Sequence, residues 1–472
     1  MSAQSDGRSR RRFPSSRRRA TLTEDDITVV EAPTLRRAVG ATAIGNTMEW
    51  FDFGVYSYLA ATLGKVFYPE ATPTVQLLAT FTTFAAAFLV RPLGGLVFGP
   101  LGDRFGRRNV LATTMIMMAV ATFCLGLIPS YAAIGVWAPA LLLVVRMLQG
   151  FSTGGEYAGA MTFLSEYSPD RRRGFLGSWL EFGTLTGYVL GAGLVTAITS
   201  ALPEQDVVGW AWRIPFLVAG PLGLIGLYLR LRLEETPAYS RMASSREDER
   251  GGEFRTIIVR WWRAMLLCIG LVLAFNVTNY MLTSYMPTYL SSVLGYRESH
   301  GLLLVLVVMV AMMVAITFVG RLSDRVGRRP VVLVGCGLLV VFAVPSFLLV
   351  QMGGVLPVFA GVALQGLMLL CFNSTLPSTL PALFPTRVRY GGLSIAFNIS
   401  VALFGGTTPL VSEALIAETG SKIIPAVLLV VAGLVGGVAM WFTHESAGKP
   451  MPGSGPTVSS RQEAKELAAR SR

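Results

Sequence analysis

The chain is 472 residues long, and 52% of its residues are hydrophobic while only 14% are charged, against about 25% charged in an ordinary soluble domain. This composition excludes a soluble globular protein. The formal net charge of +12 would suit a nucleic-acid-binding protein, but such proteins need a continuous basic face with stacking aromatic side chains. Because the basic residues here are divided among short loops between apolar runs, we predict no nucleic-acid partner.

The first segment of the chain, residues 1–36, is polar and strongly basic. It holds seven arginines between Arg8 and Arg19, and an acidic patch at residues 24–26 follows them. No apolar run begins before about residue 37, so this segment is not a cleavable signal peptide. We expect residues 1–36 to form a disordered cytoplasmic tail.

From about residue 37 onwards, apolar runs of about 20 residues recur, each long enough to cross a hydrocarbon core of ~30 Å as a helix. We therefore predict an all-α membrane protein with twelve transmembrane helices in two six-helix bundles. The bundles occupy residues 37–231 and 263–442, with a cytoplasmic linker at 232–262 and a short cytoplasmic tail at 443–472. The expected spans lie near residues 37–63, 76–101, 109–128, 137–164, 174–200, 212–231, 263–290, 301–321, 330–350, 355–383, 391–417 and 422–442.

The two bundles are copies of one unit. The sequence GPLGDRFGRR at Gly99–Arg108 returns as GRLSDRVGRR at Gly320–Arg329, and LQG at residues 148–150 recurs at residues 364–366. Two packed repeats are typical of secondary transporters, which bind substrate at the seam near the bilayer midplane and expose it alternately to each side. Duplication therefore indicates a transport function.

The repeated motif is a short, charged, glycine-bearing loop. Arginines recur in every second loop, and the positive-inside rule then places both termini in the cytoplasm. The glycines permit a tight reversal, and each aspartate can hold a helix N-terminus or an arginine; simple anchoring of arginines at lipid headgroups is the alternative. We predict two gating loops that form a latch between the halves, made by Gly99, Asp103, Arg104, Gly106 and Arg107 in one and by Gly320, Asp324, Arg325, Gly327 and Arg328 in the other.

Six charged residues fall inside the predicted spans of the N-terminal half. A charge at the bilayer centre costs at least ~2.5–3.5 kcal/mol on insertion scales, so each needs a partner, a proton or a water-filled cavity. Depths counted along the helices group three of the six near the outer boundary and three near the inner one. The outer group is Glu49, Asp52 and Arg146, and the inner group is Arg91, Glu156 and Glu181.

In these groups four carboxyl groups face two arginines. Burial and a neighbouring like charge both favour the neutral form of a carboxyl group, so we predict that these residues couple transport to protons. Glu49 or Asp52 would carry the proton with Arg146 as its switching partner, and Glu156 and Glu181 would relay it inward. The alternative is a set of permanent salt bridges that only hold helices together.

The C-terminal half carries amides and hydroxyls in place of intramembrane charges. These groups suit hydrogen bonding to a small zwitterion, although hydrogen bonding between helices is the alternative role for each asparagine. Aromatic faces of the N-terminal half can hold an ammonium group by cation–π attraction; the alternative is that these rings serve only in helix packing. Arg146 can bind a carboxylate. The predicted substrate-binding residues are Trp50, Phe53, Tyr56, Arg146, Tyr157, Asn276, Asn279, Tyr280, Asn373 and Asn398.

Residues suited to metal binding or covalent chemistry are scarce. The two histidines, His300 and His444, lie near predicted span ends, and the four cysteines lie inside apolar runs at no metal-ligand spacing. We expect no metal, no cofactor and no catalytic residue, which disfavours a membrane-embedded enzyme. No segment outside the spans is long enough for a folded signalling domain, which disfavours a sensor.

Several stretches resemble the major facilitator superfamily and, within it, the metabolite:proton symporter family. They are NTMEWFDFGVYSYLAATLGKVF at residues 46–67, RPLGGLVFGPLGDRFGR at 91–107, QGFSTGGEYAGA at 149–160 and EYSPDRRRGFLGSW at 166–179. Further stretches, among them TSYMPTYL at 283–290 and LPALFPTRVRY at 380–390, are most similar to the members that take up compatible solutes. The likeness runs from about residue 37 to 446.

The resemblance implies osmoprotectant uptake across the bacterial cytoplasmic membrane by proton symport of proline, glycine betaine or ectoine. Because related members carry dicarboxylates, citrate, 2-oxoglutarate or shikimate, a carboxylate symporter is the alternative. The surplus of acid in the spans favours a zwitterion over an anion. The expected partners are the solute, protons and membrane lipid, while the preferred solute, the proton stoichiometry, osmotic activation and the oligomeric state stay open.

Overall fold

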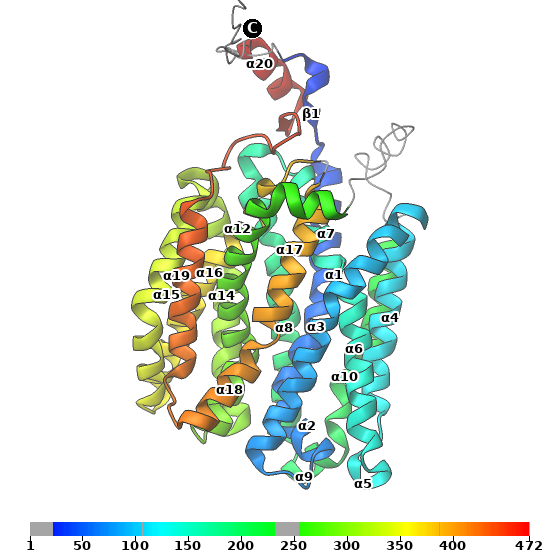
Figure 1. Cartoon of the computed structure of the whole chain (residues 1–472), viewed down its shortest axis with the longest axis vertical. Helices are drawn as coiled ribbons and strands as arrows, with labels where there is room; N and C mark the ends of the chain where they lie inside the picture. The colour runs from blue at the N-terminus through cyan, green and yellow to red at the C-terminus, as the bar shows by residue number, and fades with distance from the viewer. Residues whose placement is uncertain (1–21, 106, 232–253, 387, 472) are drawn as a thin grey trace, which may run out of the picture.

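The computed structural model describes residues 22–105, 107–231, 254–386 and 388–471. Long helices run side by side between two ends of the molecule (Figure 1). Strand β1 (Thr28–Val29), near the start of the described chain, and helix α20 (Arg461–Ser471), near its end, lie together at one end. The short helices α5 (Tyr131–Ile134) and α9 (Glu204–Asp206) lie at the opposite end.

Each bundle is built from six crossings, some of them broken. The N-terminal bundle holds α1 (Ala32–Tyr58) continued by α2 (Ala60–Phe67), α3 (Pro73–Phe105), α4 (Arg107–Leu127), α6 (Trp137–Thr153) continued by α7 (Glu156–Tyr167), α8 (Arg173–Ala201), and α10 (Arg213–Leu231) preceded by η3 (Val207–Ala211). In the C-terminal bundle, the first crossing is α12 (Phe254–Tyr280) continued by η4 (Met281–Tyr285), α13 (Met286–Thr288) and η5 (Tyr289–Val293). The next three are single helices, α14 (Glu298–Val326), α15 (Arg328–Gln351) and α16 (Val355–Thr379). The fifth is α17 (Arg389–Ser400) continued by η7 (Val401–Gly405) and α18 (Thr408–Thr419), and the sixth is α19 (Ile424–Trp441).

Hydropathy and length account for these crossings. Within the described residues, eight segments are long and apolar enough to cross a membrane, and a bent pair that ends in α10 makes a ninth. The other three are the shorter α4 and the broken pairs α1–α2 and α6–α7, whose charges and breaks lower their hydropathy. The predicted twelve-helix membrane fold is confirmed.

Glycines bring α3 and α6 into backbone contact. A Cβ atom on Gly150 would lie 1.7 Å from the Ala87 carbonyl oxygen, and one on Gly94 would lie 1.8 Å from that of Phe151. Such close approach is how membrane helices gain packing energy without a hydrophobic driving force between them. The α3–α6 contact therefore fixes the frame that carries the charged residues described below.

We expect Gly150→Ala to lower the thermal unfolding temperature of the purified protein in detergent by several degrees. The new methyl group meets backbone, which cannot move aside as a flexible side chain would, and overpacking of this kind costs about 1–3 kcal/mol. Gly40→Ala on α1 is the matched control, because nothing lies within 4 Å of its Cβ position. Equal unfolding temperatures for both variants would contradict the packing described here.

The segment before α1 differs from the prediction of a disordered tail. Residues 28–29 pair in parallel with β2 (Thr457–Val458), a short 3-10 turn precedes them, and α1 begins at Ala32 rather than near residue 37. The apolar Ile27 is buried against Val458 and two alanines of α20, so a short hydrophobic run orders this segment. Residues 1–21 lie outside the described residues.

The predicted linker also differs in part. Residues 232–253 lie outside the described residues, but α12 already begins at Phe254, ahead of the expected span start at residue 263. The backbone is non-helical at Trp261 (φ −114°, ψ 17°), and the first turns of α12 lie across the end of the bundle (Figure 1). The described part of the C-terminal half thus starts with helical turns that lie across the end of the bundle.

Candidate functional site

Three buried carboxyl groups of the N-terminal half line one cavity. Glu49 and Asp52 of α1 and Glu156 of α7 face a space of about 30 Å³ that α4 and α10 close with methionines and small residues. A space of this size holds one or two water molecules. No group of His, Cys, Asp or Glu within the described residues is arranged to hold a metal ion. We call Glu49, Asp52 and Glu156 the carboxyl cluster.

Glu49 pairs with Arg91 of α3, with 3.1 Å between Oε1 and Nη2 and both side chains buried. The depth count had placed Glu49 in the outer group and Arg91 in the inner group, so this pair was not predicted. The first crossing continues through α2, so Glu49 lies 18 residues from the end of that crossing at Phe67. Arg91 lies 18 residues from the start of α3 at Pro73, which puts both about 27 Å along their helices.

Asp52 reaches Arg146 through two neutral side chains. Arg146 Nη1 donates to Gln149 Oε1 (2.8 Å), Gln149 Nε2 donates to Thr122 Oγ1 (2.6 Å), and Thr122 Oγ1 donates to Asp52 Oδ2 (2.7 Å). The expected association of Asp52 with Arg146 is therefore indirect. Gln149 and Thr122 were not predicted as site residues. They could have been found as a polar residue one helical turn from Arg146 (Gln149) and a polar residue inside a neighbouring span (Thr122).

Arg146 is enclosed by aromatic rings of its own half. Its guanidinium carbon lies 4.0 Å from the ring centre of Tyr56, 5.2 Å from that of Phe53 and 5.4 Å from that of Phe84. Phe53 and Tyr56, predicted to bind substrate, therefore surround an arginine in this conformation. Arg146 itself, predicted to bind the substrate carboxylate, faces these rings and Gln149.

Glu156 and Glu181 lie in different surroundings. Glu156 accepts a short hydrogen bond from Thr114 and lines the cavity with Glu49 and Asp52. Glu181 is fully buried on α8 and does not line that cavity, and neither of its carboxylate oxygens has a hydrogen-bond partner within the described residues. The structure therefore brings Glu156 to the carboxyl cluster and leaves Glu181 apart from it.

Aromatic side chains of both halves meet at the seam. The Trp50 ring lies 5.5 Å from Tyr188, 6.0 Å from Tyr157 and 6.1 Å from Tyr280, measured between ring centres, and Tyr157 stacks on Phe397 at 4.9 Å. Tyr280 and Phe397 belong to the C-terminal half. We call these five residues the aromatic cage. Of the five, Tyr188 and Phe397 were not predicted, since an aromatic residue in an apolar span carries no signal of its own.

The predicted amides divide into two kinds. Asn276 Nδ2, Asn279 Oδ1 and both amide atoms of Asn373 are buried without a hydrogen-bond partner in the described part of the chain, as is the Tyr280 hydroxyl. Asn398 Nδ2, in contrast, donates to the carbonyl oxygens of residues 154 and 394, so it ties α17 to the break between α6 and α7. Orphaned buried polar atoms of the first kind are groups for which a ligand can serve as the partner.

The C-terminal half does contain a buried carboxyl group, contrary to the prediction. Glu413 of α18 accepts a hydrogen bond of 2.9 Å from the Tyr285 hydroxyl of η4. Glu413 was not among the predicted intramembrane charges, although it lies within the span expected near residues 391–417. Tyr285 in turn lies 6.0 Å from Phe81 of α3 between ring centres, so this pair sits at a contact between the halves.

The sequence of this chain is similar to those of known membrane transport proteins. The sequence matches the Major Facilitator Superfamily over residues 42–396 and 303–469. The chain belongs to the major facilitator superfamily. It is 49% identical over 454 residues to the proline/betaine transporter of Escherichia coli K12, covering 94% of this chain and 91% of that protein. It is equally identical over 451 residues to the glycine betaine/proline/ectoine/pipecolic acid transporter of Dickeya dadantii, covering 94% and 90%.

The fold is shared with solved structures of the superfamily. The proton:xylose symporter XylE superposes with a TM-score of 0.71 at 16% sequence identity, covering 89% of this chain and 98% of that one. This likeness concerns the fold alone. The superfamily relatives and the fold are those of transporters, not of enzymes, and the chain is a multi-pass membrane protein.

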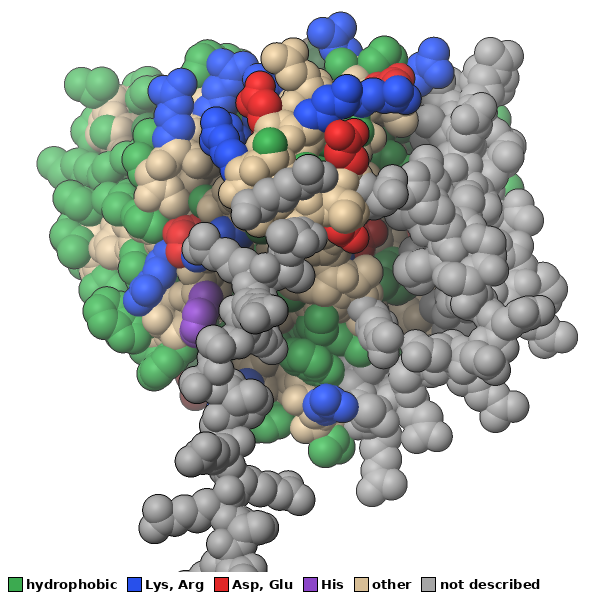
Figure 2. Space-filling model, turned by 90° about the horizontal axis from the view of Figure 1, so that it is seen from above, with side chains coloured by type: hydrophobic (Ala, Val, Ile, Leu, Met, Phe, Trp, Pro, Cys, Tyr) green, Lys and Arg blue, Asp and Glu red, His purple; other side chains and the backbone are tan. Residues whose placement is uncertain are grey.

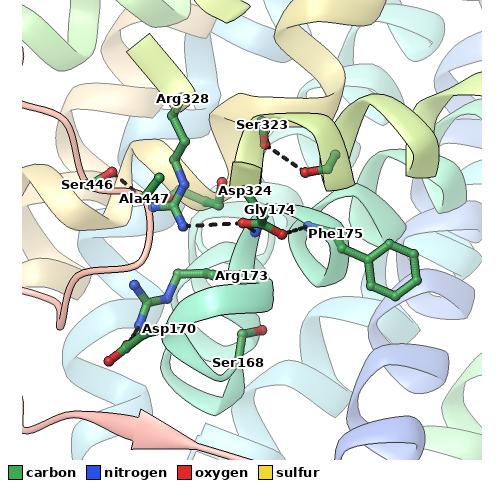
Figure 3. A network of polar contacts seen from close by, with 12 residues as sticks. Ser168, Asp170, Arg173, Gly174, Phe175, Ser323, Asp324, Arg328, Ser446 and Ala447 are labelled. Carbon is green, nitrogen blue, oxygen red and sulfur yellow. Dashed lines mark hydrogen bonds and ion pairs between the residues drawn. The ribbon is translucent and has the colours of Figure 1, made fainter. Parts of the chain in front are cut away.

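The second predicted gating loop joins the two halves of this superfamily member at the end where β1 and α20 lie. Asp324 of α14 accepts hydrogen bonds from the backbone N–H groups of Gly174 (2.7 Å) and Phe175 (2.8 Å) at the start of α8 (Figure 3). A carboxylate at a helix N-terminus is favoured by the helix dipole and the unpaired N–H groups there. Arg328 lies 3.9 Å from Asp324 and donates to the Ser378 carbonyl oxygen (3.0 Å).

The other predicted gating residues have different positions. Gly327 takes a positive φ of 104° between α14 and α15, which favours glycine. A Cβ atom on Gly320 would lie 2.7 Å from Ser178 Oγ of the other half, and Arg325 is exposed. The first loop, with Gly99, Asp103, Arg104, Gly106 and Arg107, lies outside the residues whose side chains the structure describes.

Residues 445–458, which we call the C-terminal strap, contact both halves at the end where β1 and α20 lie. The strap accepts hydrogen bonds from Arg389 of the C-terminal half (2.9 Å, to Pro452) and from Arg173 of the N-terminal half (3.2 Å, to Lys449). The Thr457 N–H donates to Asp170 (3.1 Å). Viewed from this end, Lys, Arg, Asp and Glu side chains gather on the described face and hydrophobic ones lie along part of its rim (Figure 2).

The start of the strap is fixed by Glu445. Its carboxylate accepts hydrogen bonds from the backbone N–H groups of Arg328 (3.1 Å) and Arg329 (2.9 Å) at the start of α15, and from those of Ser446 and Ala447. Partial burial raises the pKa of Glu445, but these four N–H groups together hold the pKa below its ordinary value. The cap is therefore ionised throughout the neutral pH range.

Proposed function

We propose that this chain is a proton-coupled symporter of zwitterionic compatible solutes, working by alternating access in a bacterial cytoplasmic membrane with both termini in the cytoplasm. The observation that carries the proton coupling is the carboxyl cluster. Of Glu49, Asp52 and Glu156, only Glu49 has an arginine at ion-pair distance in the described part of the chain. Two further ionised carboxylates in one small membrane-buried cavity would be costly, so protons neutralise them.

Asp52 is the carboxyl group best placed to link a proton to a change in shape. Its hydrogen-bonded chain through Thr122 and Gln149 ends on Arg146. Protonation of Asp52 removes the negative end of this chain and weakens the hold of α1 on α4 and α6. Glu156 shares the cavity, so one or two water molecules can pass a proton between the two groups. The relay predicted for Glu181 has no shared cavity behind it and stays a prediction.

The aromatic cage and the amides next to it are the proposed solute site. The cage offers ring faces from both halves, and cation–π attraction to a quaternary or secondary ammonium is worth about 2 kcal/mol when desolvated. Orphaned atoms of Asn276, Asn279, Asn373 and Tyr280 can bind the polar groups of the solute. The names of the relatives from E. coli and D. dadantii, which include proline, betaine and ectoine, support a solute of this class.

Alternating access is supported by contacts between the halves at the proposed cytoplasmic end. The bonds of Asp324 to α8, the ion pair between Arg389 and Glu166 (2.7 Å) and the strap all join the halves there. Each must break or move with one half when the site opens inward. Together these contacts form the proposed inner gate.

Uptake by reconstituted vesicles tests the proposal. With an imposed inward proton gradient, we expect labelled glycine betaine and proline to accumulate above their outside concentrations, and a protonophore to abolish the accumulation. Accumulation of citrate or shikimate instead would establish the carboxylate alternative. Uptake of betaine that ignores the proton gradient would contradict proton coupling.

We expect Trp50→Leu to raise the KM for betaine about tenfold, since the indole ring supplies the central face of the cage and its cation–π contribution is lost. Trp50→Phe keeps a ring and is expected to retain most of the affinity. Trp210→Leu, at an exposed tryptophan, is the matched control and should leave KM unchanged. An unchanged KM in Trp50→Leu would remove Trp50 from the solute site.

A further inference from the structure

Glu181 is the buried ionisable group that the carboxyl cluster leaves unexplained. Its side chain is 0% exposed, and both carboxylate oxygens lack a hydrogen-bond partner within the described residues. The cost of burying an unpartnered carboxylate is high. A group of this kind is retained where a cation or a proton completes the site.

Glu181 lies beside the aromatic cage. Thr184 and Tyr188 follow it by about one and two turns on the same side of α8. The carboxylate is near enough to the hydroxyls of Tyr188 and Tyr280 to interact with them electrostatically, and both rings contact Trp50. Glu181 therefore borders the site from the N-terminal half while Tyr280 borders it from the other.

Asn46 fixes Trp50 relative to this part of α8. Its Oδ1 accepts from the indole Nε1 of Trp50 (3.1 Å), and its Nδ2 donates to the carbonyl oxygen of Leu180 (2.9 Å), the residue before Glu181. An aromatic face and a carboxylate are thus held in one rigid arrangement. A ring face with a nearby anion is the combination that recognises a quaternary or secondary ammonium group.

The same site is also within reach of a cation. Arg91 has two orphaned guanidinium nitrogens, Nε and Nη1, in the described part of the chain, and its charge acts on the Tyr280 hydroxyl as that of Glu181 does. Glu49 also acts on this hydroxyl, but it is paired with Arg91, so Glu181 is the carboxylate here without an ion-pair partner in the described part of the chain, as an ammonium group would require. An anionic carboxylate without an ammonium group would meet Glu181 with repulsion.

We propose that Glu181 is the specificity-determining residue that binds the ammonium group of the solute, an inference that rests on the proposed transport of zwitterions. In this role Glu181 acts in binding, and its charge is neutralised by the solute itself. It differs from the relay role, in which Glu181 would act only when protons move.

Counterflow in vesicles without a proton gradient separates these roles, because exchange of labelled for unlabelled solute needs binding but no net proton movement. We expect Glu181→Gln to raise the counterflow KM for betaine ~10- to 100-fold, the loss of a charge-assisted contact, and Glu181→Asp to recover part of it. The comparison solute is 3,3-dimethylbutanoate, which has the shape of betaine with a neutral carbon in place of the nitrogen. Wild-type protein should discriminate strongly between the two, and Glu181→Gln should not.

Each other outcome has a distinct meaning. If Glu181→Gln keeps the betaine KM and the discrimination but loses proton-driven accumulation, the residue is a relay and the inference is overturned. If wild-type protein exchanges no zwitterion at all, the proposed function fails before the variant is compared. A cooperative thermal unfolding transition in detergent shows that each variant is folded. Glu413→Gln, at a buried carboxyl group of the other half, is the matched control and should have the wild-type counterflow KM for both betaine and 3,3-dimethylbutanoate.

Discussion

Asp52→Asn is expected to abolish proton-driven accumulation of betaine while counterflow continues. The amide keeps the size of the side chain and can still accept the hydrogen bond that Thr122 donates over 2.7 Å. It cannot take up or release a proton, however, so the gradient no longer drives the cycle. The accumulation ratio should therefore fall to unity, measured with labelled betaine in vesicles with an imposed pH gradient.

Glu49→Gln tests the same cluster and needs a different control. Because Glu49 pairs with the buried Arg91, the single variant leaves an uncompensated charge, which costs about 3–5 kcal/mol. The double variant Glu49→Gln, Arg91→Gln removes both charges and should regain stability without regaining coupled uptake. Proton-driven accumulation that survives in both Asp52→Asn and Glu49→Gln would rule out the carboxyl cluster as the coupling site.

Asp324→Ala is expected to open the proposed cytoplasmic end. The variant loses two charge-assisted hydrogen bonds to the N-terminus of α8, each worth about 1.5–3 kcal/mol. Even the lower value is enough to shift the balance between closed and inward-open forms at least tenfold. A cysteine in place of Ser378, which is buried at this end between the halves, should then react faster with a maleimide applied from the cytoplasmic side.

The labelling is done in a background whose four native cysteines are replaced, since Cys124 is exposed. Asp206→Ala is the matched control, because Asp206 is an exposed aspartate of α9 at the opposite end of the bundle. An unchanged labelling rate in Asp324→Ala would mean that the Asp324 contacts do not hold the gate closed.

The sequence predicts the crossings well and the pairing of charges poorly. Hydropathy over about 20 residues and the repeated loop motif are strong local signals, and they suffice for the twelve crossings. Which charged side chains pair with each other depends on how each helix is rotated about its axis and where it bends. The depth of a residue along one span gives no information on either. The pairing of Arg91 with Glu49 follows from the continuation of α1 into α2, which no motif marks.

The solute site shows the same limit. Trp50 and Tyr157 were predicted for their aromatic faces and Tyr280 among the polar neutral groups of its half, and the structure brings the three together. Tyr188 and Phe397 complete the cage, yet in sequence each looks like an ordinary apolar residue of a membrane helix. An aromatic residue of the cage differs from one that only fills space between helices in its contacts across the seam between the halves, which the sequence does not show.

The pairing of β1 with β2 makes the molecule a closed ring at one face. Residues 30–31 connect α1 of the N-terminal bundle to β1, and the strap, which contains β2, leads from the strand pair back to the C-terminal bundle. The two bundles can therefore move apart at this end only if the strand pair opens or if the segments that connect it to the bundles become more extended. Two backbone hydrogen bonds, donated by the N–H groups of Thr28 and Val30, join these strands, so under the proposed alternating access we expect this link to open first when the halves move apart at this end.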